Sequence, residues 1–221
     1  SENVKLNIQG TSSVDVVIEK AIKPISAADF KDFSTKKNTI ILDVRHQEEF
    51  VKGFIPNAIF IGIDGGFAPW VGAIIKTVET PILLVCDKDR LQETATRLSR
   101  VGFDNILGHL QGGIKSWDVN DLHTMQSISA EKFASIYKED TAIHIVDVRK
   151  AIEYNSQHIS GAELAPLGNL DKQHDKLTTS NENFVHCAAG YRSVIAGSLL
   201  KKQGIINIIN VEGGFGAIKE T

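Results

Sequence analysis

A long internal repeat constrains this chain more than any other feature of its sequence. Ile41-Leu-Asp-Val-Arg45 recurs as Ile145-Val-Asp-Val-Arg149, a shift of 104 residues. The two cysteines, Cys86 and Cys187, are related by a shift of 101 residues, and so are Gly112-Gly113 and Gly213-Gly214. Because the shift is nearly constant across about eighty positions, the 221 residues are predicted to form two copies of one domain of about 100 residues.

Each copy alternates short β-branched runs with amphipathic stretches, which is the pattern of parallel strands joined by crossover helices. The second copy is predicted to contain strands at 143–147, 183–186 and 206–210, a short helix from about residue 150, and a long helix at 191–203 with separate apolar and polar faces. The first copy matches, with strands at 39–43 and 81–85 and a helix from residue 91. We expect two doubly wound α/β domains at 24–118 and 119–221, after an N-terminal extension at 1–23.

Composition excludes several classes of protein. The 24 basic and 27 acidic side chains give a net charge of −3, whereas a nucleic-acid binder needs a basic surplus. No apolar run approaches the ~20 residues that span a bilayer, and no signal-peptide pattern is present. Two cysteines are too few for the disulfide framework of a small secreted domain. We therefore expect a soluble, cytoplasmic protein without nucleic-acid or membrane partners.

The segment with the clearest chemistry is Phe184-Val-His-Cys-Ala-Ala-Gly-Tyr-Arg-Ser193. It places Cys187 where a strand ends, at the ligand-binding edge of an open α/β sheet. Small residues then allow backbone N–H groups to turn inward, and the next helix adds its positive end. These donors and the cation of Arg192 would favour the thiolate and an anionic ligand, which makes Cys187 a candidate nucleophile. The alternative is that Cys187 is only a small buried apolar residue.

This segment and three others resemble the tandem rhodaneses, a sulfurtransferase family of two related α/β domains with the nucleophile in the second. The other three are Asp147-Val-Arg149, His158-Ile-Ser-Gly-Ala162 and Gly213-Gly214. The resemblance covers about residues 24–221 and places the family's six-residue active-site loop at Cys187–Arg192. Cysteine phosphatases have one more residue between Cys and Arg, so the resemblance favours sulfur over phosphate chemistry.

The resemblance implies that Cys187 takes the outer sulfur of thiosulfate or of a low-molecular-weight persulfide and passes it to a thiol or cyanide. Arg192 would be the second catalytic residue and would orient the anions. Substrate-binding positions would be Ala188, Ala189, Gly190 and Tyr191, although Tyr191 could equally serve loop packing. No cofactor is implied. The seven histidines contain no His-x-His or His-x3-His pair, so no metal site is predicted.

Two further hypotheses remain open: a non-catalytic sulfur-carrier or regulatory module of a larger protein, and, less favoured, a cysteine phosphatase. A finer resemblance rests on the segment at 62–72 followed by Pro81-Ile-Leu-Leu-Val-Cys86. This pattern is similar to the rhodanese pair that follows a metallo-β-lactamase-fold persulfide dioxygenase in bacterial fusion proteins. It implies that residues 1–23 are a connector from such a domain, which would be a partner in the full-length protein.

The first copy departs from the pattern at its cysteine. Cys86-Asp-Lys-Asp-Arg90 contains no glycine and is one residue shorter before its arginine. The carboxylates of Asp87 and Asp89 would disfavour a thiolate, and an amide cradle is harder to form without glycine. We therefore expect Cys86 to be inert, the first domain to act as a scaffold or docking surface, and no disulfide to join the two cysteines.

Several polar residues around the loop are predicted to be structural. Asp147 and Asp43 would fix the adjacent loops by accepting backbone N–H bonds. Arg149 with Glu153, and Arg45 with Glu49, are spaced as ion pairs at the start of a helix. His186 precedes the nucleophile, but strand alternation points it to the other face. His158 is expected to be structural as well.

Overall fold

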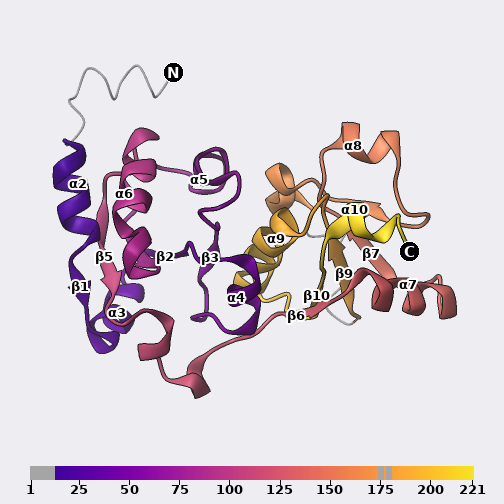
Figure 1. The fold of residues 1–221 in the computed structure, drawn as a ribbon, viewed down its shortest axis with the longest axis horizontal. Helices are drawn as coiled ribbons and strands as arrows, with labels where there is room; N and C mark the ends of the chain where they lie inside the picture. The colour runs from indigo at the N-terminus through magenta and orange to yellow at the C-terminus, as the bar shows by residue number, and fades with distance from the viewer. Residues whose placement is uncertain (1–12, 174–176, 178–180) are drawn as a thin grey trace. The chain divides into compact units, whose positions relative to one another are not determined.

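The computed structural model describes residues 13–173, 177 and 181–221, which fall into two compact units (Figure 1). Unit 1 comprises Ser1–His46 and Phe54–His123, and unit 2 comprises Gln47–Gly53 and Thr124–Thr221. Each unit contains one five-stranded sheet whose strand pairs are all parallel. The predicted pair of α/β domains is confirmed.

Unit 1 has the strand order β1-β5-β4-β2-β3. Its strands are β1 (Pro24–Ile25), β2 (Ile40–Asp43), β3 (Ile59–Phe60), β4 (Ile82–Val85) and β5 (Ile106–Leu110). Its helices are α2 (Val14–Ala21), α3 (Ala27–Ser34), α5 (Phe67–Ile74) and α6 (Leu91–Arg100), with 3₁₀ turns at Lys88–Arg90, Gly113–Ser116 and Val119–Asp121. All four residues of β4 are buried, as expected for a strand inside a parallel sheet covered on both faces.

The segment predicted as an extension contributes to unit 1. Residues 14–21 form α2, whose first turn is capped by the Ser13 hydroxyl accepting from Val16 N. Val17 and Ala21 are buried as α2 packs against α6 and β5. The predicted extension is thus partly a helix of unit 1, and the part at 1–12 lies outside the described residues.

Unit 2 repeats this sheet in the order β6-β10-β9-β7-β8. Its strands are β6 (Gln126–Ile128), β7 (His144–Asp147), β8 (Glu163–Leu164), β9 (Asn183–His186) and β10 (Ile208–Val211). Its helices are α4 (Gln47–Lys52), α7 (Ala130–Glu139), α8 (Ala151–Ser156), α9 (Tyr191–Lys202) and α10 (Gly214–Ile218), with a 3₁₀ segment at Leu167–Lys172. The strands predicted at 143–147, 183–186 and 206–210 are confirmed to within two residues at each end.

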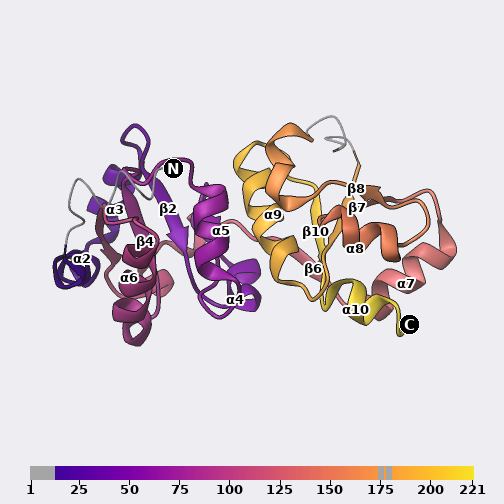
Figure 2. The ribbon, with the colours of Figure 1, turned by 90° about the horizontal axis from the view of Figure 1, so that it is seen from above.

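The sheet of unit 2 is covered on both faces. On one face, Phe133 of α7 packs with Phe184 of β9 and Ile209 of β10, and Ile218 of α10 lies against this cluster. Figure 2 shows α9 on the opposite side of β10 from α7 and α10. Because β9 is the central strand, the residue that follows it lies at the middle of the carboxyl edge of the sheet.

Helix α9 is more deeply buried than its sequence predicts. Its residues 193–198 and Leu200 are all buried, so the predicted separation into an apolar and a polar face is wrong. Burial of the two serines is possible because their hydroxyls donate to helix carbonyls: Ser193 Oγ to Gly190 O at 3.2 Å and Ser198 Oγ to Ile195 O at 2.7 Å. Small polar side chains can thus lie inside the unit without losing hydrogen bonds.

The aromatic side chains are divided unevenly between the units. Both tryptophans, Trp70 and Trp117, lie in unit 1. All three tyrosines lie in unit 2, at 137, 154 and 191. Each unit therefore carries one type of polar aromatic ring that the other lacks.

Candidate functional site

Cys187 follows β9 directly and begins a short loop that ends where α9 starts at Tyr191. Gly190 caps α9 with a left-handed backbone (φ +90°, ψ −10°), a conformation that favours glycine. This turn brings the Gly190 amide back to the start of the loop, where it donates to Cys187 Sγ at 3.1 Å. The fold of the loop thus directs a backbone hydrogen-bond donor at the sulfur of Cys187.

The predicted site residues lie in this loop and in the first turn of α9, at different depths. Cys187 is 1% exposed and Gly190 is buried, whereas Ala188, Tyr191 and Arg192 are half-buried and Ala189 is exposed. The sulfur thus lies at the bottom of the loop, and the residues around it reach toward the surface. Because the sulfur is so little exposed, only a small or narrow part of a reacting molecule can reach it.

A hydroxyl that the sequence analysis did not single out also contacts the sulfur. Ser193 Oγ lies 3.6 Å from Cys187 Sγ, in the first turn of α9. The signal in the sequence is a hydroxyl residue one position after Arg192, within the same loop-to-helix segment. The sulfur therefore has a backbone amide and a hydroxyl as polar neighbours.

Arg192 is held by a carboxylate from a different helix. Its two terminal nitrogens donate to Glu153 Oε2 and Oε1, both at 2.7 Å, which is a bidentate ion pair. Glu153 also accepts the amide of Lys150 at the start of α8, at 3.0 Å, so the residue that caps α8 holds Arg192 as well. The hydrogen bonds from Arg192 lower the pKa of Glu153 to about 2.

The predicted ion pair between Arg149 and Glu153 is therefore wrong. Arg149 instead bonds to both oxygens of Asp147, with Nη2 to Oδ2 at 2.6 Å, and donates to Gln157 O at 2.8 Å. The side chain of Arg149 folds back along the chain, because a buried carboxylate two residues earlier needs a cation next to it. Sequence spacing cannot distinguish this partner from Glu153.

The structural role predicted for the two aspartates is confirmed. Asp147 Oδ1 accepts the amide of Arg149 at 2.9 Å, and Asp43 Oδ1 accepts that of Arg45 at 3.2 Å. Arg45 bonds to both oxygens of Asp43, which repeats the arrangement of the second copy, and Glu49 pairs with Lys52. Both aspartates are fully buried at the ends of their strands.

The two histidines expected to be structural, His186 and His158, both contact other residues of unit 2. His186 is buried, its Nδ1 donates to Cys187 O at 3.3 Å, and its ring stacks on Phe215 with centroids 6.2 Å apart. Burial lowers the pKa of His186, which keeps the ring uncharged at neutral pH. His158 stacks on Tyr154 with ring centroids 3.9 Å apart.

The environment of Cys86 differs from that of Cys187. Cys86 Sγ donates to Asp87 O at 3.2 Å and lies 3.4 Å from Thr94 Oγ1. Burial, followed by the charges of Asp87 and Asp43, raises the pKa of this thiol to about 11. The direction agrees with the prediction, but burial contributes more than the neighbouring carboxylates. Both cysteines are free.

The arginine of the first loop faces other groups. Arg90 donates to Asp64 at 2.8 Å and to Glu93 at 2.7 Å, both of which are carboxylates of unit 1. In the first copy, residues 88–90 form a 3₁₀ turn, whereas the second copy has a loop capped by glycine. The first copy thus has a protonated, buried thiol where the second has an amide directed at sulfur.

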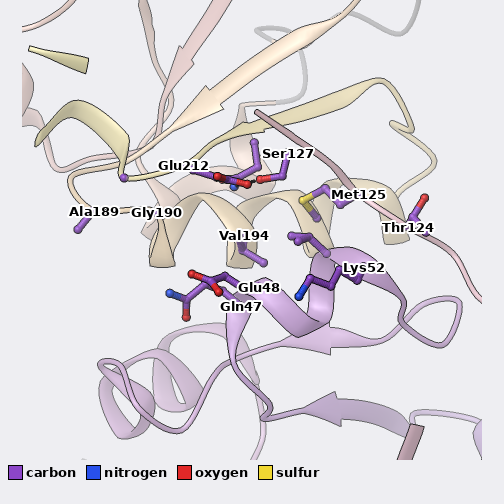
Figure 3. A pocket seen from close by; sticks show the side chains of 13 residues that line it. Gln47, Glu48, Lys52, Thr124, Met125, Ser127, Ala189, Gly190, Val194 and Glu212 are labelled. Atoms are coloured by element: carbon purple, nitrogen blue, oxygen red, sulfur yellow. Dashed lines mark hydrogen bonds between the residues drawn. The ribbon is translucent and has the colours of Figure 1, made fainter. Parts of the chain in front are cut away.

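A cavity of about 710 Å³ in unit 2 borders the Cys187 loop (Figure 3). Ala189 and Gly190 lie at one end of it, and Val194 and Met125 lie farther along α9. The cavity meets the loop at these small residues and not at the sulfur itself. Its volume is that of a site for a small organic molecule.

The described residues show neither a metal site nor a membrane span. Within 13–173, 177 and 181–221, no three His, Cys, Asp or Glu side chains are placed to hold a metal ion. Over the same ranges, no helix has the length and apolar composition that crossing a bilayer requires.

Comparisons with known proteins point to one family. The family model of the rhodanese-like domain matches the chain twice, over residues 26–120 and 129–221. The chain is 36% identical over 91 residues to the putative sulfur carrier protein YrkF of Bacillus subtilis, a match covering 41% of this chain and 49% of that protein. It is 33% identical over 72 residues to the probable adenylyltransferase/sulfurtransferase MoeZ of Mycobacterium tuberculosis, covering 32% of this chain and 18% of that protein.

The chain also matches solved structures. A rhodanese-like domain protein from Staphylococcus aureus is 30% identical with a TM-score of 0.41, covering 42% of this chain and 91% of that chain. A thiosulfate sulfurtransferase from Pseudomonas aeruginosa is 22% identical with a TM-score of 0.37, covering 88% of this chain and 41% of that chain. This chain spans about half the length of YrkF.

Proposed function

Since the chain belongs to the rhodanese family, with two rhodanese-like domains over most of its length, we propose that it is a sulfurtransferase that carries sulfane sulfur as a persulfide on Cys187. The observation that carries this proposal is the Gly190 amide directed at Cys187 Sγ at 3.1 Å. An N–H in that position stabilises the negative charge of the Cys187 thiolate, which attacks the donor and is released again when the acceptor takes the sulfur. The buried thiol of Cys86, with its pKa raised to about 11, has no such support.

The proposed reaction has two displacement steps. The Cys187 thiolate attacks the outer sulfur of the donor, a new S–S bond forms, and the bond between that sulfur and the rest of the donor breaks. With thiosulfate, sulfite leaves with the electron pair. An acceptor thiolate or cyanide then attacks the outer sulfur of the persulfide, and the Cys187 thiolate leaves with the electron pair. No net oxidation of the protein occurs over the cycle.

Arg192 is proposed to attract and orient the anionic donor and acceptor. Its guanidinium is half-buried beside the loop, and the bidentate pair with Glu153 holds it in one place. A fixed cation orients an anion at a lower entropic cost than a mobile one. The cavity beside Ala189 and Gly190 offers room for the part of a donor or acceptor that stays outside the loop.

A second candidate function is that of a sulfur carrier whose chemistry is completed by another domain. It is favoured by the similarity to YrkF, which is itself a putative sulfur carrier protein. A carrier would accept one sulfur per chain, whereas an enzyme would cycle. Turnover with thiosulfate and cyanide, counted as thiocyanate formed per chain, separates the two functions.

The direct experiment is intact-mass measurement after incubation with thiosulfate or with a low-molecular-weight persulfide. We expect the mass of one sulfur atom to be added and peptide mapping to place it on Cys187. Sulfur on Cys86, or none on either cysteine with both donors, would contradict the proposal. Release of phosphate from an aryl phosphate by the same preparation would point to the phosphatase alternative.

The fusion resemblance extends the proposal to the source of sulfur. A metallo-β-lactamase-fold persulfide dioxygenase in the same polypeptide would make a low-molecular-weight persulfide the natural donor. Comparing kcat/KM for thiosulfate and for such a persulfide tests this preference. Higher kcat/KM with thiosulfate would count against the link.

A further inference from the structure

The C-terminal helix is bonded directly to the backbone of the Cys187 loop. At the start of α10, the amide of Phe215 donates to Cys187 O at 2.6 Å and the amide of Gly216 donates to Ala188 O at 2.9 Å. His186 Nδ1 also donates to Cys187 O, at 3.3 Å. Two consecutive carbonyls of the loop are therefore occupied on the side that faces α10.

Occupied carbonyls fix the direction of the amides. A trans peptide group is planar and places its C=O and N–H on opposite sides. With the carbonyls of Cys187 and Ala188 held by α10, the N–H groups of Ala188 and Ala189 must point away from α10. Neither of these peptide groups can rotate without breaking a hydrogen bond, so α10 sets the orientation of the first half of the loop.

The approach of the two backbones depends on glycine at position 214. Gly214 has a left-handed backbone (φ +57°), and a Cβ there would collide with Cys187 O and lie 2.9 Å from both Ala188 C and Ala189 N. All three are backbone atoms, which cannot swing aside as the end of a side chain can. At the equivalent position of the first copy, Gly113 is also left-handed (φ +64°), but its Cβ would meet no atom within 4 Å. The second copy thus has a close approach between this glycine and the backbone of the cysteine loop, and the first copy does not.

The ring of Phe215 fixes α10 to the residues beneath the loop. It lies under the guanidinium of Arg149, 4.0 Å from the ring centroid, and stacks on His186. Arg149 is itself held by the buried carboxylate of Asp147. The start of α10 is thus attached to both β7 and β9, the strands that end beside the loop.

We propose that Gly214 and Phe215 are positioning residues for sulfur transfer: they hold the first two peptide groups of the Cys187 loop, so that the rest of the loop brings the Gly190 amide to Cys187 Sγ. They touch the loop and not the substrate, so their effect acts through the backbone of Cys187 and Ala188. This inference rests on the proposed function. It gives the Gly213-Gly214 repeat a role in the second copy that it does not have in the first.

The test compares Gly214→Ala with the matched control Gly113→Ala. Both variants add one methyl group at a left-handed glycine, but only the first places it against the catalytic loop. In Gly214→Ala we expect the rate of persulfide formation to fall by tenfold or more, since small misplacements of reacting groups cost up to about 10²-fold. In Gly113→Ala we expect the wild-type rate.

A second readout separates positioning from a general loss of structure. The pH dependence of Cys187 alkylation reports how well the loop supports the thiolate. It should move to higher pH in Gly214→Ala and stay in place in Gly113→Ala. The titratable and charged groups around the loop are the same in both variants: Asp147, Arg149, Glu153, His186 and Arg192.

If Gly214→Ala does not fold, Phe215→Leu tests the proposal instead. This variant keeps the backbone amide of residue 215 but loses the ring contacts with Arg149 and His186. A lower kcat with a shifted alkylation profile supports the proposal. Wild-type kcat and an unmoved profile in a folded variant would overturn it. If the wild-type chain forms no persulfide, the proposed function fails, while the alkylation profiles still decide whether α10 positions the loop.

Discussion

Replacing Glu153 by Gln should remove the charge from the ion pair with Arg192 while keeping the shape of the side chain. Both hydrogen bonds of this pair measure 2.7 Å, and the side chains are 30% and 18% exposed. The pKa of Glu153 lies at about 2, against an ordinary value of 4.5. That difference corresponds to at most about 3 kcal/mol. Because water reaches part of the carboxylate, we expect the variant to lose about 1–2 kcal/mol of unfolding free energy at neutral pH.

The loss should depend on pH in one direction. The folded-state pKa of Glu153 is lowered, so its contribution to stability is fully present above the ordinary value of 4.5. It disappears as the pH falls through that value toward about 2. The difference in unfolding free energy between wild type and Glu153→Gln should therefore be constant from neutral pH to about pH 5.5 and then shrink in acid.

Hydrogen exchange followed by mass spectrometry can measure this difference for peptides of unit 2 alone. Glu220→Gln is the control, because Glu220 also lies in unit 2, its contact with Lys219 is long (3.7 Å), and its side chain is 75% exposed. It should change stability by no more than about 0.5 kcal/mol. A loss in Glu153→Gln that equals the control, or that stays the same in acid, would refute the assignment of this energy to the Glu153–Arg192 pair.

Other substitutions test the roles of the two loops. Cys187→Ser should abolish sulfur transfer in a thiosulfate–cyanide assay and Cys86→Ser should leave it nearly intact; equal losses would contradict the division of roles. Arg192→Ala should raise the donor KM more than it lowers kcat, because a charge that holds the anion is lost, and a normal KM would exclude that role. Alkylation of the native protein at neutral pH should spare Cys86, whose pKa is about 11; rapid labelling of Cys86 in peptide maps would contradict a buried, protonated thiol.

The repeat and its strands could be predicted from the sequence because their signals are local. Four-residue strands such as β4 and β9 are long enough to be recognised, and the loop that begins at Cys187 follows directly from β9. The edge strands β1, β3 and β8 have two residues each and carry no recognisable period. They exist because a neighbouring strand offers hydrogen bonds, which only the folded sheet shows.

The parts of the site that the sequence did not predict are contacts between distant segments. Glu153 and Arg192 are 39 residues apart, so a nearer arginine at the right helical spacing was the better candidate from sequence alone. The hydrogen bond from the Phe215 amide to Cys187 O joins segments 28 positions apart through backbone atoms, which no side-chain pattern reveals. Burial, the larger cause of the raised pKa of Cys86, cannot be read from the sequence for a related reason: it depends on the whole unit and not on the neighbouring residues.

The uneven distribution of tryptophan and tyrosine decides what an optical experiment can see. Light that excites only indole rings reports on Trp70 and Trp117, and so on the half of the chain that contains Cys86. A fluorescence melt recorded in this way would not detect unfolding of the half that contains Cys187. A variant that is unfolded in that half would give the signal of the native protein. The phenol rings at 137, 154 and 191 provide the missing signal, so the two halves can be followed at different wavelengths in one cuvette without adding a label.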